Sequence, residues 1–139
     1  MEVPYDELDT NIVELVRVFN SFPGIHTVGS CGGHDNPESY QSPAGSWDIV
    51  FRIEVEDLRA TKSGWLSLEF LVYAFNNVFY RSGLKVFIGP YSVPPHFNEP
   101  GSSMTFRAAG PEDPTDIAHL LMNLKQECFV MNDASTFAQ

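Results

Sequence analysis

The chain of 139 residues is 43% hydrophobic, 13% aromatic and 19% charged, a composition that supports one folded domain with a buried core and excludes a disordered or fibrous protein. Its 18 Asp and Glu residues outnumber its 8 Lys and Arg residues, which gives a formal net charge of −10 and disfavours binding to a nucleic-acid backbone. Neither a membrane-spanning run nor a secretion signal is expected from the sequence, and two cysteines, Cys31 and Cys128, favour a reducing, cytoplasmic setting over a disulfide framework.

The first half of the chain is predicted to form one helix and two strands. Apolar residues recur every three or four positions over residues 6–20, which is the spacing of an amphipathic helix. A short strand follows over 25–30, and then a long loop over 31–46 that is rich in glycine and proline, a kind of loop that often carries function. Residues 47–55 alternate between apolar and charged side chains, as a half-buried strand does.

The second half is predicted to contain two further strands and two helices. Residues 64–81 are apolar around most of the helix circumference, so we expect this helix to be buried on more than one side, either centrally or against a second subunit. Asp113 and Pro114 suit the cap and the first residue of the last helix. The elements expected after residue 81 are a strand over 84–89, a proline-rich loop over 90–102, a strand over 103–109, a helix over 114–130 and a frayed tail over 131–139.

This order of elements indicates an α+β fold. After an N-terminal helix, two strand–loop–strand–helix units would form a mainly antiparallel four-stranded sheet with the helices on one face. Local similarity between the units suggests a duplication. Val50-Phe51-Arg52 matches Thr105-Phe106-Arg107 in corresponding strands, and both long loops contain a His-x-Asn sequence, at His34 and at His96. A duplication would place the two loops at related ends of the sheet.

The most informative stretch is Ser30-Cys31-Gly32-Gly33-His34, at the predicted end of the first strand. Two adjacent glycines let a backbone approach a ligand closely and present amide N–H groups to an anion or carboxylate. Ser30 and His34 add side-chain donors. We therefore expect Ser30, Cys31, Gly32, Gly33 and His34 to bind a ligand. The alternative is a tight turn in which Cys31 packs as a small apolar residue.

Cys31 allows two further interpretations. Its Cys-x-x-His spacing with His34 fits a metal pair, but a closed zinc site needs four ligands, and the other candidates, Cys128, His96 and His119, are scattered along the chain. We therefore predict no metal. The second interpretation is a Cys31 nucleophile with a histidine base. Non-covalent recognition by backbone amides and histidine requires least of the sequence, and we favour it.

Arg52 and Arg107 fall on the strand face opposite the apolar side chains, and Lys85 is placed similarly in its own strand. Arginine holds phosphate or carboxylate groups in a fixed fork, so the two arginines are candidate ligands for an anion. The alternative is that they pair with acidic neighbours such as Asp48 or Glu54.

The second long loop adds His96 and Tyr91 to the candidate site. His96 would approach the ligand as His34 does if the duplication is real, and Tyr91 would form an aromatic wall against a base or ring. The alternative for both residues is a stiff, proline-rich surface loop without a ligand. The sequence contains no GxxxxGK[ST], GxGxxG, GxSxG or HExxH motif, so catalysis is not predicted by motif and is left open.

A helix ending in Asn20-Ser21 leads into a strand ending in Ser30-Cys31-Gly32-Gly33-His34. Trp47 at the start of a strand and Ser82-Gly83 at the end of a helix extend the pattern over about half of the chain. These features resemble the amino-terminal part of the wyosine-pathway tRNA methyltransferases, in which a strand runs into a Ser-Cys-Ser-Gly-Arg sequence.

The resemblance implies that Ser30, Cys31 and Gly33 line the pocket that in this family holds S-adenosylmethionine and a modified guanosine. His34 stands where the family has arginine, and the acidic chain lacks the basic surface that gripping tRNA requires. We therefore expect a relative that kept a nucleotide-sized pocket without the tRNA surface.

Three functions are compared in order of preference. The first is the binding or sequestration, without a cofactor, of a small polar or nucleotide-like ligand that carries negative charge. The second is S-adenosylmethionine-dependent methyl transfer to a base or nucleoside. The third is an interaction module that buries the apolar second helix, or the open face of the sheet, against another copy of the chain in a homo-oligomer or against a partner.

Overall fold

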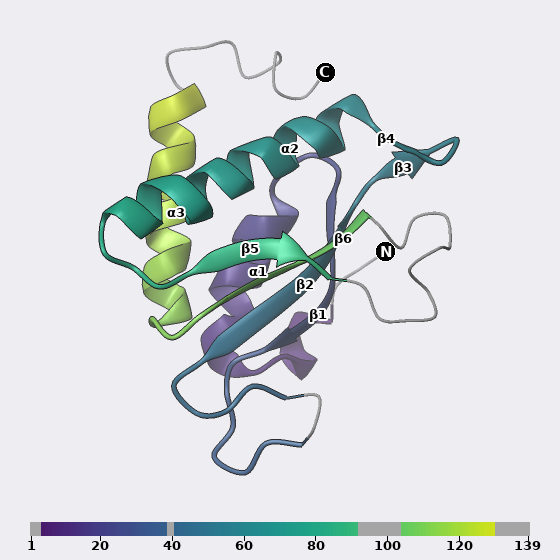
Figure 1. The fold of residues 1–139 in the computed structure, drawn as a ribbon. Coiled ribbons are helices and arrows are strands. Elements are labelled where there is room, and N and C mark those ends of the chain that lie inside the picture. Colours follow the sequence, from purple (N-terminus) through teal and green to yellow (C-terminus); the bar gives the residue numbers. More distant parts are fainter. Residues whose placement is uncertain (1–3, 39–40, 92–103, 130–139) are drawn as a thin grey trace.

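The computed structural model describes residues 4–38, 41–91 and 104–129, and Figure 1 shows how their helices and strands are arranged. Among these residues, none of the helices combines the length and the hydropathy that crossing a bilayer requires. The predicted tail over 131–139 lies outside the described residues. In chain order, the elements are two 3₁₀ turns (Tyr5–Glu7 and Thr10–Ile12), α1 (Val13–Asn20), β1 (Ile25–Cys31), β2 (Trp47–Ile53), β3 (Val55–Glu56), β4 (Arg59–Ala60), α2 (Lys62–Tyr73), a π-helical segment (Ala74–Phe79), β5 (Phe87–Pro90), β6 (Thr105–Gly110) and α3 (Pro114–Phe129).

Four strands form one antiparallel sheet in the order β1-β2-β6-β5, which confirms the predicted α+β fold. The central strands β2 and β6 pair so that Phe51 lies opposite Phe106 and Arg52 lies opposite Thr105. A two-fold axis that passes between these two phenylalanines would exchange Val50-Phe51-Arg52 with Thr105-Phe106-Arg107. This strand order and register are those that two repeated units would produce, and they are the structural support for the duplication hypothesis.

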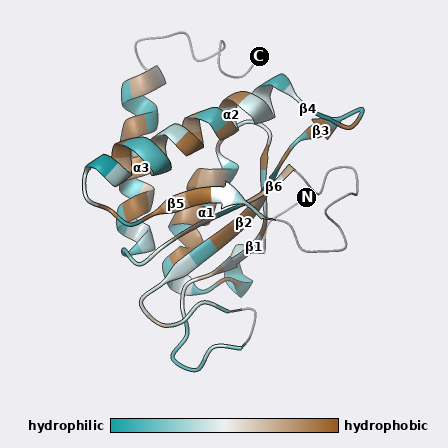
Figure 2. Ribbon diagram, in the orientation of Figure 1, coloured by the Kyte–Doolittle hydropathy of each residue, from teal (hydrophilic) through white to brown (hydrophobic). Residues whose placement is uncertain are grey.

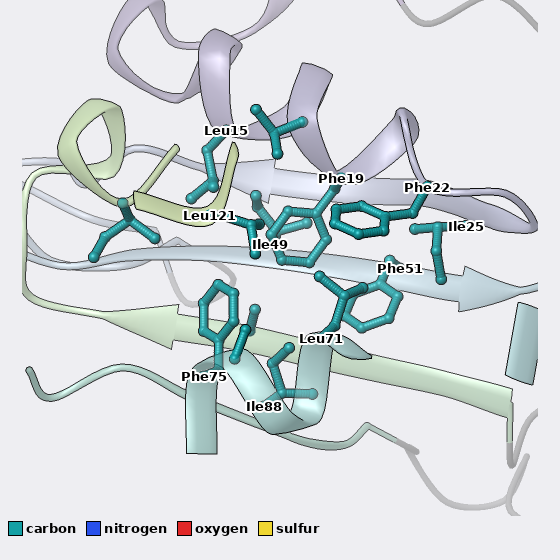
Figure 3. Close-up of a cluster of buried hydrophobic side chains, with 14 of the residues drawn as sticks. Leu15, Phe19, Phe22, Ile25, Ile49, Phe51, Leu71, Phe75, Ile88 and Leu121 are labelled. Carbon is teal, nitrogen blue, oxygen red and sulfur yellow. The ribbon is translucent and has the colours of Figure 1, made fainter. Parts of the chain in front are cut away.

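The three α-helices lie against one face of the sheet (Figure 1). The ring of Phe19 on α1 packs against Phe51 of β2, with centroids 5.3 Å apart, and against Phe75 after α2, at 5.7 Å. Leu121 of α3 belongs to the same buried cluster (Figure 3). Hydrophobic residues are also prominent along β2 and β5 (Figure 2). The core is therefore a single layer between the sheet and its helices, and none of the described helices lies on the opposite sheet face.

The helix that begins with α2 buries one side and exposes aromatic residues on the other. Leu71 and Phe75 are fully buried, whereas the exposed fractions of Trp65, Tyr73 and Tyr80 are 50%, 48% and 69%. The sequence predicted burial of this helix on more than one side. In the single chain, the core covers its inner side and leaves these three aromatic side chains exposed.

The π-helical segment after α2 covers an edge of the sheet. Asn76 accepts a hydrogen bond from the Ile88 N–H at its Oδ1 and donates from its Nδ2 to the Ile88 carbonyl, both at 2.9 Å. Ile88 belongs to the edge strand β5, whose outer backbone groups would otherwise be open to pairing with another chain. The asparagine side chain therefore acts as a short substitute for a neighbouring strand.

The first helix begins later than predicted. The periodicity suggested a helix over 6–20, whereas α1 covers Val13–Asn20, because Leu8 and Asp9 are extended, with ψ angles of 157° and 134°. In this extended segment, the Asp9 carboxylate accepts a hydrogen bond from the Gly32 N–H, with 2.9 Å between the Gly32 nitrogen and Asp9 Oδ2. This tertiary hydrogen bond replaces the helix that the apolar spacing favours.

The strand predicted over 47–55 ends at Ile53, and the hairpin of β3 and β4 follows it. The hairpin turn consists of Asp57 and Leu58, which have φ angles of 52° and 64°, as a type I′ hairpin turn requires. At the start of α3, the Asp113 Oδ1 accepts the Thr115 N–H at 2.8 Å, which confirms the predicted cap.

Candidate functional site

A β-bulge in β1 determines the direction of the predicted ligand loop. The register against β2 shifts between Thr27 and Gly29, so the bulged strand carries one extra residue. Beyond the bulge, Cys31 lies opposite Asp48. Directly opposite residues of antiparallel strands point to the same side, so both point away from the helix-covered face. We call this side of the sheet, on which none of the described helices lies, the open face.

The two glycines of the loop let it pack against other parts of the chain. The Gly32 N–H donates to Asp9 Oδ2 at 2.9 Å, and the Gly32 carbonyl accepts from Asn11 Nδ2 at 2.9 Å. Gly33 has a φ of +100°, and a Cβ there would lie 2.5 Å from the carbonyl oxygen of Ser46. A carboxylate of the protein itself therefore occupies the Gly32 amide, which the sequence assigned to an external anion.

His34 and Cys31 are held by the loop segment that follows them. The His34 N–H donates to the Ser42 carbonyl at 2.9 Å, and the His34 carbonyl accepts from the Ala44 N–H at 2.8 Å. The Ser42 N–H donates to Cys31 Sγ at 3.3 Å. His34 Nε2 lies 3.2 Å from Asp9 Oδ2. A thiol, an imidazole and a carboxylate therefore come together at the end of β1.

Arg52 and Arg107 both lie on the open face, as the alternation predicted. Arg107 Nε donates to Asp48 Oδ2 at 3.0 Å, with side chains 35% and 16% exposed, so the acidic pairing considered as the alternative is present for this residue. It uses one of the five N–H donors of the guanidinium group. The exposed Arg52 lies between His26 and Thr105 in the register.

The open face is hollowed where residues 41–46 approach β5 and β6. The hollow has a volume of about 500 Å³, and we call it the sheet-face hollow. The lining residues that could contact a ligand through charge, hydrogen bonds or rings include Ser42, Asp48, Lys85, Phe87, Tyr91 and Arg107.

Two of the predicted site residues, Tyr91 and Arg107, line the sheet-face hollow. The loop of residues 30–34 and Arg52 are not among its lining residues, and His96 lies outside the described residues. Lys85 lines the hollow on the face that the sequence assigned to it.

Sequence reasoning missed Phe87 and Ser42 as lining residues. Phe87 lies two positions after Lys85, and the strand period could have placed both side chains on one face. Ser42 carried no such signal, because its position depends on the long loop folding back on His34.

The sheet-face hollow combines positive charge with aromatic surface. The guanidinium carbon of Arg107 lies 6.0 Å from the ring centroid of Phe87, which is within the range of a cation–π contact. Phe87 and Tyr91 are 48% and 40% exposed, so their rings are accessible to a ligand. The Lys85 backbone N–H donates to Glu112 Oε2 at 2.7 Å, which anchors the chain beside the hollow. The arrangement can hold an anionic group next to a planar ring.

A second hollow, of about 810 Å³, runs along the outer side of α2 and the π-helical segment. Its lining includes Trp65, Val72, Tyr73 and Tyr80. We call this surface the α2 groove. Its chemistry is mainly apolar and aromatic, which suits contact with another apolar surface rather than with a polar metabolite.

Comparison of the chain with protein families, with curated proteins and with solved structures finds no match. The resemblance to the wyosine-pathway methyltransferases therefore stays a prediction that rests on short stretches of sequence.

Proposed function

We propose that this protein binds a small anionic, ring-bearing ligand of nucleotide-like chemistry in the sheet-face hollow. The observation that carries the proposal is that Lys85 and Arg107, two of the chain's 8 basic residues, line one hollow together with Phe87 and Tyr91. Binding, or sequestration, is the activity that this geometry supports, since charge-assisted hydrogen bonds and ring stacking are contacts that recognise such a ligand.

The lining of the hollow differs from the acidic chain as a whole, since Lys85 and Arg107 outnumber Asp48 among its charged residues. A net charge of −10 repels anions at long range, so an anionic ligand needs cations at short range and partial shielding from water. The hollow, at about 500 Å³, is in the size range of small-molecule sites, roughly 300–1,000 Å³. Charge-assisted hydrogen bonds from Arg107 and Lys85 would hold the anionic group, and the ring of Tyr91 would stack on the ligand's ring.

Thermal-shift measurements on chelator-treated protein test the proposal, with a panel of nucleotides, cyclic nucleotides, nucleosides and S-adenosylmethionine. A ligand at 100 times its Kd should raise the free energy of unfolding by about 2.7 kcal/mol. Stabilisation by anionic nucleotides and not by the matching nucleosides supports the proposal. Stabilisation by S-adenosylmethionine alone favours the methyltransferase alternative, and a panel without any stabilisation contradicts both.

Point variants test where on the molecule the ligand binds. Arg107→Ala should weaken binding of the anionic ligand by about 1.5–3 kcal/mol, and Tyr91→Ala should weaken binding of any ring-bearing ligand. Arg52→Ala is the matched control, because Arg52 shares the open face but does not line the hollow. Equal losses for Arg52→Ala and Arg107→Ala would place the ligand elsewhere on the sheet and contradict the proposed location.

The second candidate function is self-association through the α2 groove, which the exposed Trp65, Tyr73 and Tyr80 favour. Light scattering across a range of protein concentrations tests it. A dimer that Tyr73→Lys dissociates, with the fold retained by circular dichroism, supports self-association at this surface. A monomer at all concentrations contradicts it and leaves ligand binding in the sheet-face hollow unaffected.

A further inference from the structure

Three side chains of the kinds that bind transition metals meet at the end of β1. Asp9 lies between the two 3₁₀ turns, Cys31 is the last residue of β1, and His34 follows in the loop. One ligating atom of each residue lies within 4.8 Å of the other two. The sequence predicted no metal, because a closed zinc site needs four ligands and the candidates beyond Cys31 and His34 were scattered along the chain. Asp9 was assigned to the first helix.

The donor set matches the preferences of zinc. Zn²⁺ binds cysteine sulfur, histidine nitrogen and carboxylate oxygen, and sites with three protein ligands hold water or another small ligand in the fourth position. Cys31 is buried, whereas the side chains of His34 and Asp9 are 34% and 37% exposed. The sulfur would therefore be shielded by protein, and a fourth position could face solvent.

Surrounding hydrogen bonds orient the three side chains. The Gly32 N–H donates to the Asp9 carboxylate at 2.9 Å, and the Ser42 N–H donates to Cys31 Sγ at 3.3 Å. The His34 backbone is fixed at both its N–H and its carbonyl by the loop that follows. Hydrogen bonds of this kind hold metal ligands in position in known sites. The backbone donor to sulfur is specific support, because it fixes the position of the Cys31 side chain.

Charge also favours a cation at this place. A thiolate and a carboxylate together balance the charge of a divalent ion, and a chain of net charge −10 attracts cations. The pair of His26 and Glu54, at 3.7 Å and with side chains 63% and 53% exposed, is an ordinary surface contact without sulfur. It provides an internal comparison for the pair of His34 and Asp9.

We propose that Asp9, Cys31 and His34 bind one Zn²⁺ ion, with a solvent molecule as the fourth ligand. The metal would tie the N-terminal segment to the end of β1 and to the loop that borders the sheet-face hollow. The proposal does not rest on ligand binding in that hollow, since none of the three metal ligands lines it.

Metal titration with the full chain tests the proposal. Chelator-treated protein should bind one equivalent of Zn²⁺, and Co²⁺ in its place should give a thiolate-to-cobalt charge-transfer band together with the visible bands of a tetrahedral site. Cys31→Ser should abolish the charge-transfer band. Asp9→Asn and His34→Ala should each weaken Zn²⁺ binding by at least about tenfold. Mutation of a residue that only hydrogen-bonds to a metal ligand already lowers metal affinity by about that much. Cys128→Ser and His26→Ala are the matched controls and should leave Zn²⁺ affinity unchanged.

A measurement on the wild-type chain removes dependence on variants that fold poorly. X-ray absorption of the Zn²⁺-loaded protein should show one sulfur at about 2.3 Å with nitrogen or oxygen ligands at about 2.0–2.2 Å. Absence of tight Zn²⁺ binding, absence of a sulfur ligand, or equal Zn²⁺ affinity in a folded Cys31→Ser variant would each overturn the proposal. A loss of binding in Cys128→Ser with Cys31→Ser unaffected would overturn it as well.

Discussion

Arg107 donates from Nε to Asp48 Oδ2 at 3.0 Å across the two central strands of the sheet. The other carboxylate oxygen of Asp48 accepts from Ser42 Oγ at 3.2 Å, and the Ser42 backbone N–H donates to Cys31 Sγ. Ser42 therefore contacts both the proposed metal site and the sheet-face hollow. Through these contacts, the position of the loop after His34 and the orientation of Arg107 depend on each other.

The first prediction concerns the stability that Asp48 contributes. Asp48→Ala removes both carboxylate hydrogen bonds on a side chain that is 16% exposed. We expect the free energy of unfolding, measured by urea denaturation, to fall by about 1.5–3 kcal/mol, as for hydrogen bonds to charged groups. Glu54→Ala is the control. Its side chain is 53% exposed, so its effect should stay within about 0.5 kcal/mol. Equal effects of the two variants would show that the Asp48 contacts contribute nothing measurable.

The second prediction separates two glycines near the candidate sites. At Gly33, which has a φ of +100°, a Cβ would lie 2.5 Å from the Ser46 carbonyl oxygen. We expect Gly33→Ala to destabilise the protein by more than the roughly 1–2 kcal/mol of left-handed backbone strain alone, because the backbone at Ser46 must also move. Gly29→Ala meets nothing within 4 Å and should change stability by less than about 0.5 kcal/mol. Urea denaturation of both variants measures the difference, and a Gly33→Ala chain as stable as wild type would contradict the described loop.

The order of elements could be predicted because it depends on local pattern. Alternation along β2 and β6 placed Arg52 and Arg107 on the open face, and the register confirms this placement. Asp113 and Pro114 marked the start of α3 correctly. These features require only neighbouring residues, so a single sequence carries them.

The candidate sites depend on contacts between distant segments, which a single sequence does not show. Asp9 leaves the helical pattern because its carboxylate accepts the Gly32 N–H and approaches His34. The bulge before Gly29 decides that Cys31 lies opposite Asp48, and nothing in the alternation of β1 predicted the extra residue. The sequence identified the glycine loop as a candidate site, but it did not identify Asp9 as the residue that accepts the Gly32 N–H.

The third prediction concerns the hairpin turn at Asp57 and Leu58. Leu58 has a φ of 64° and is 70% exposed, so its side chain adds backbone strain without contributing burial. Leu58→Gly should stabilise the protein, by at most the roughly 1–2 kcal/mol that a left-handed conformation costs an ordinary residue. Thermal unfolding measures the gain. The control is Gly45→Ala at a φ of +83° in open space, which should lower stability by a similar amount. A destabilised Leu58→Gly variant would contradict the described turn.

The fourth prediction tests which side of the helix that begins with α2 and continues through the π-helical segment holds the core together. Phe75 is fully buried, with ring centroids 5.7 Å from Phe19 and 5.4 Å from Phe79. Phe75→Ala should lower the free energy of unfolding by about 3–5 kcal/mol through lost burial and the remaining cavity. Tyr80→Ala, at a residue 69% exposed, should change it by less than about 0.5 kcal/mol at concentrations where the chain is monomeric. Urea denaturation compares them, and the reverse order of effects would reject the packing described for this helix.

The last prediction concerns pH and Lys125. Its ammonium lies 3.2 Å from Ser21 Oγ and 4.5 Å from the ring centroid of Phe22, and burial lowers its pKa below the ordinary value of 10.5. At neutral pH both the folded and the unfolded chain carry the proton, so folding bears the desolvation penalty of the charged amine. As the pH rises toward 10.5, the folded chain loses this proton before the unfolded chain does, and the penalty disappears.

Wild-type stability should therefore improve relative to Lys125→Met as the pH rises through the range just below 10.5. Urea denaturation of both proteins from about pH 8 upward measures the difference, in which the titration of all other groups cancels. A difference that stays constant, or that moves in favour of the methionine variant with rising pH, would show that the fold does not lower the pKa of Lys125.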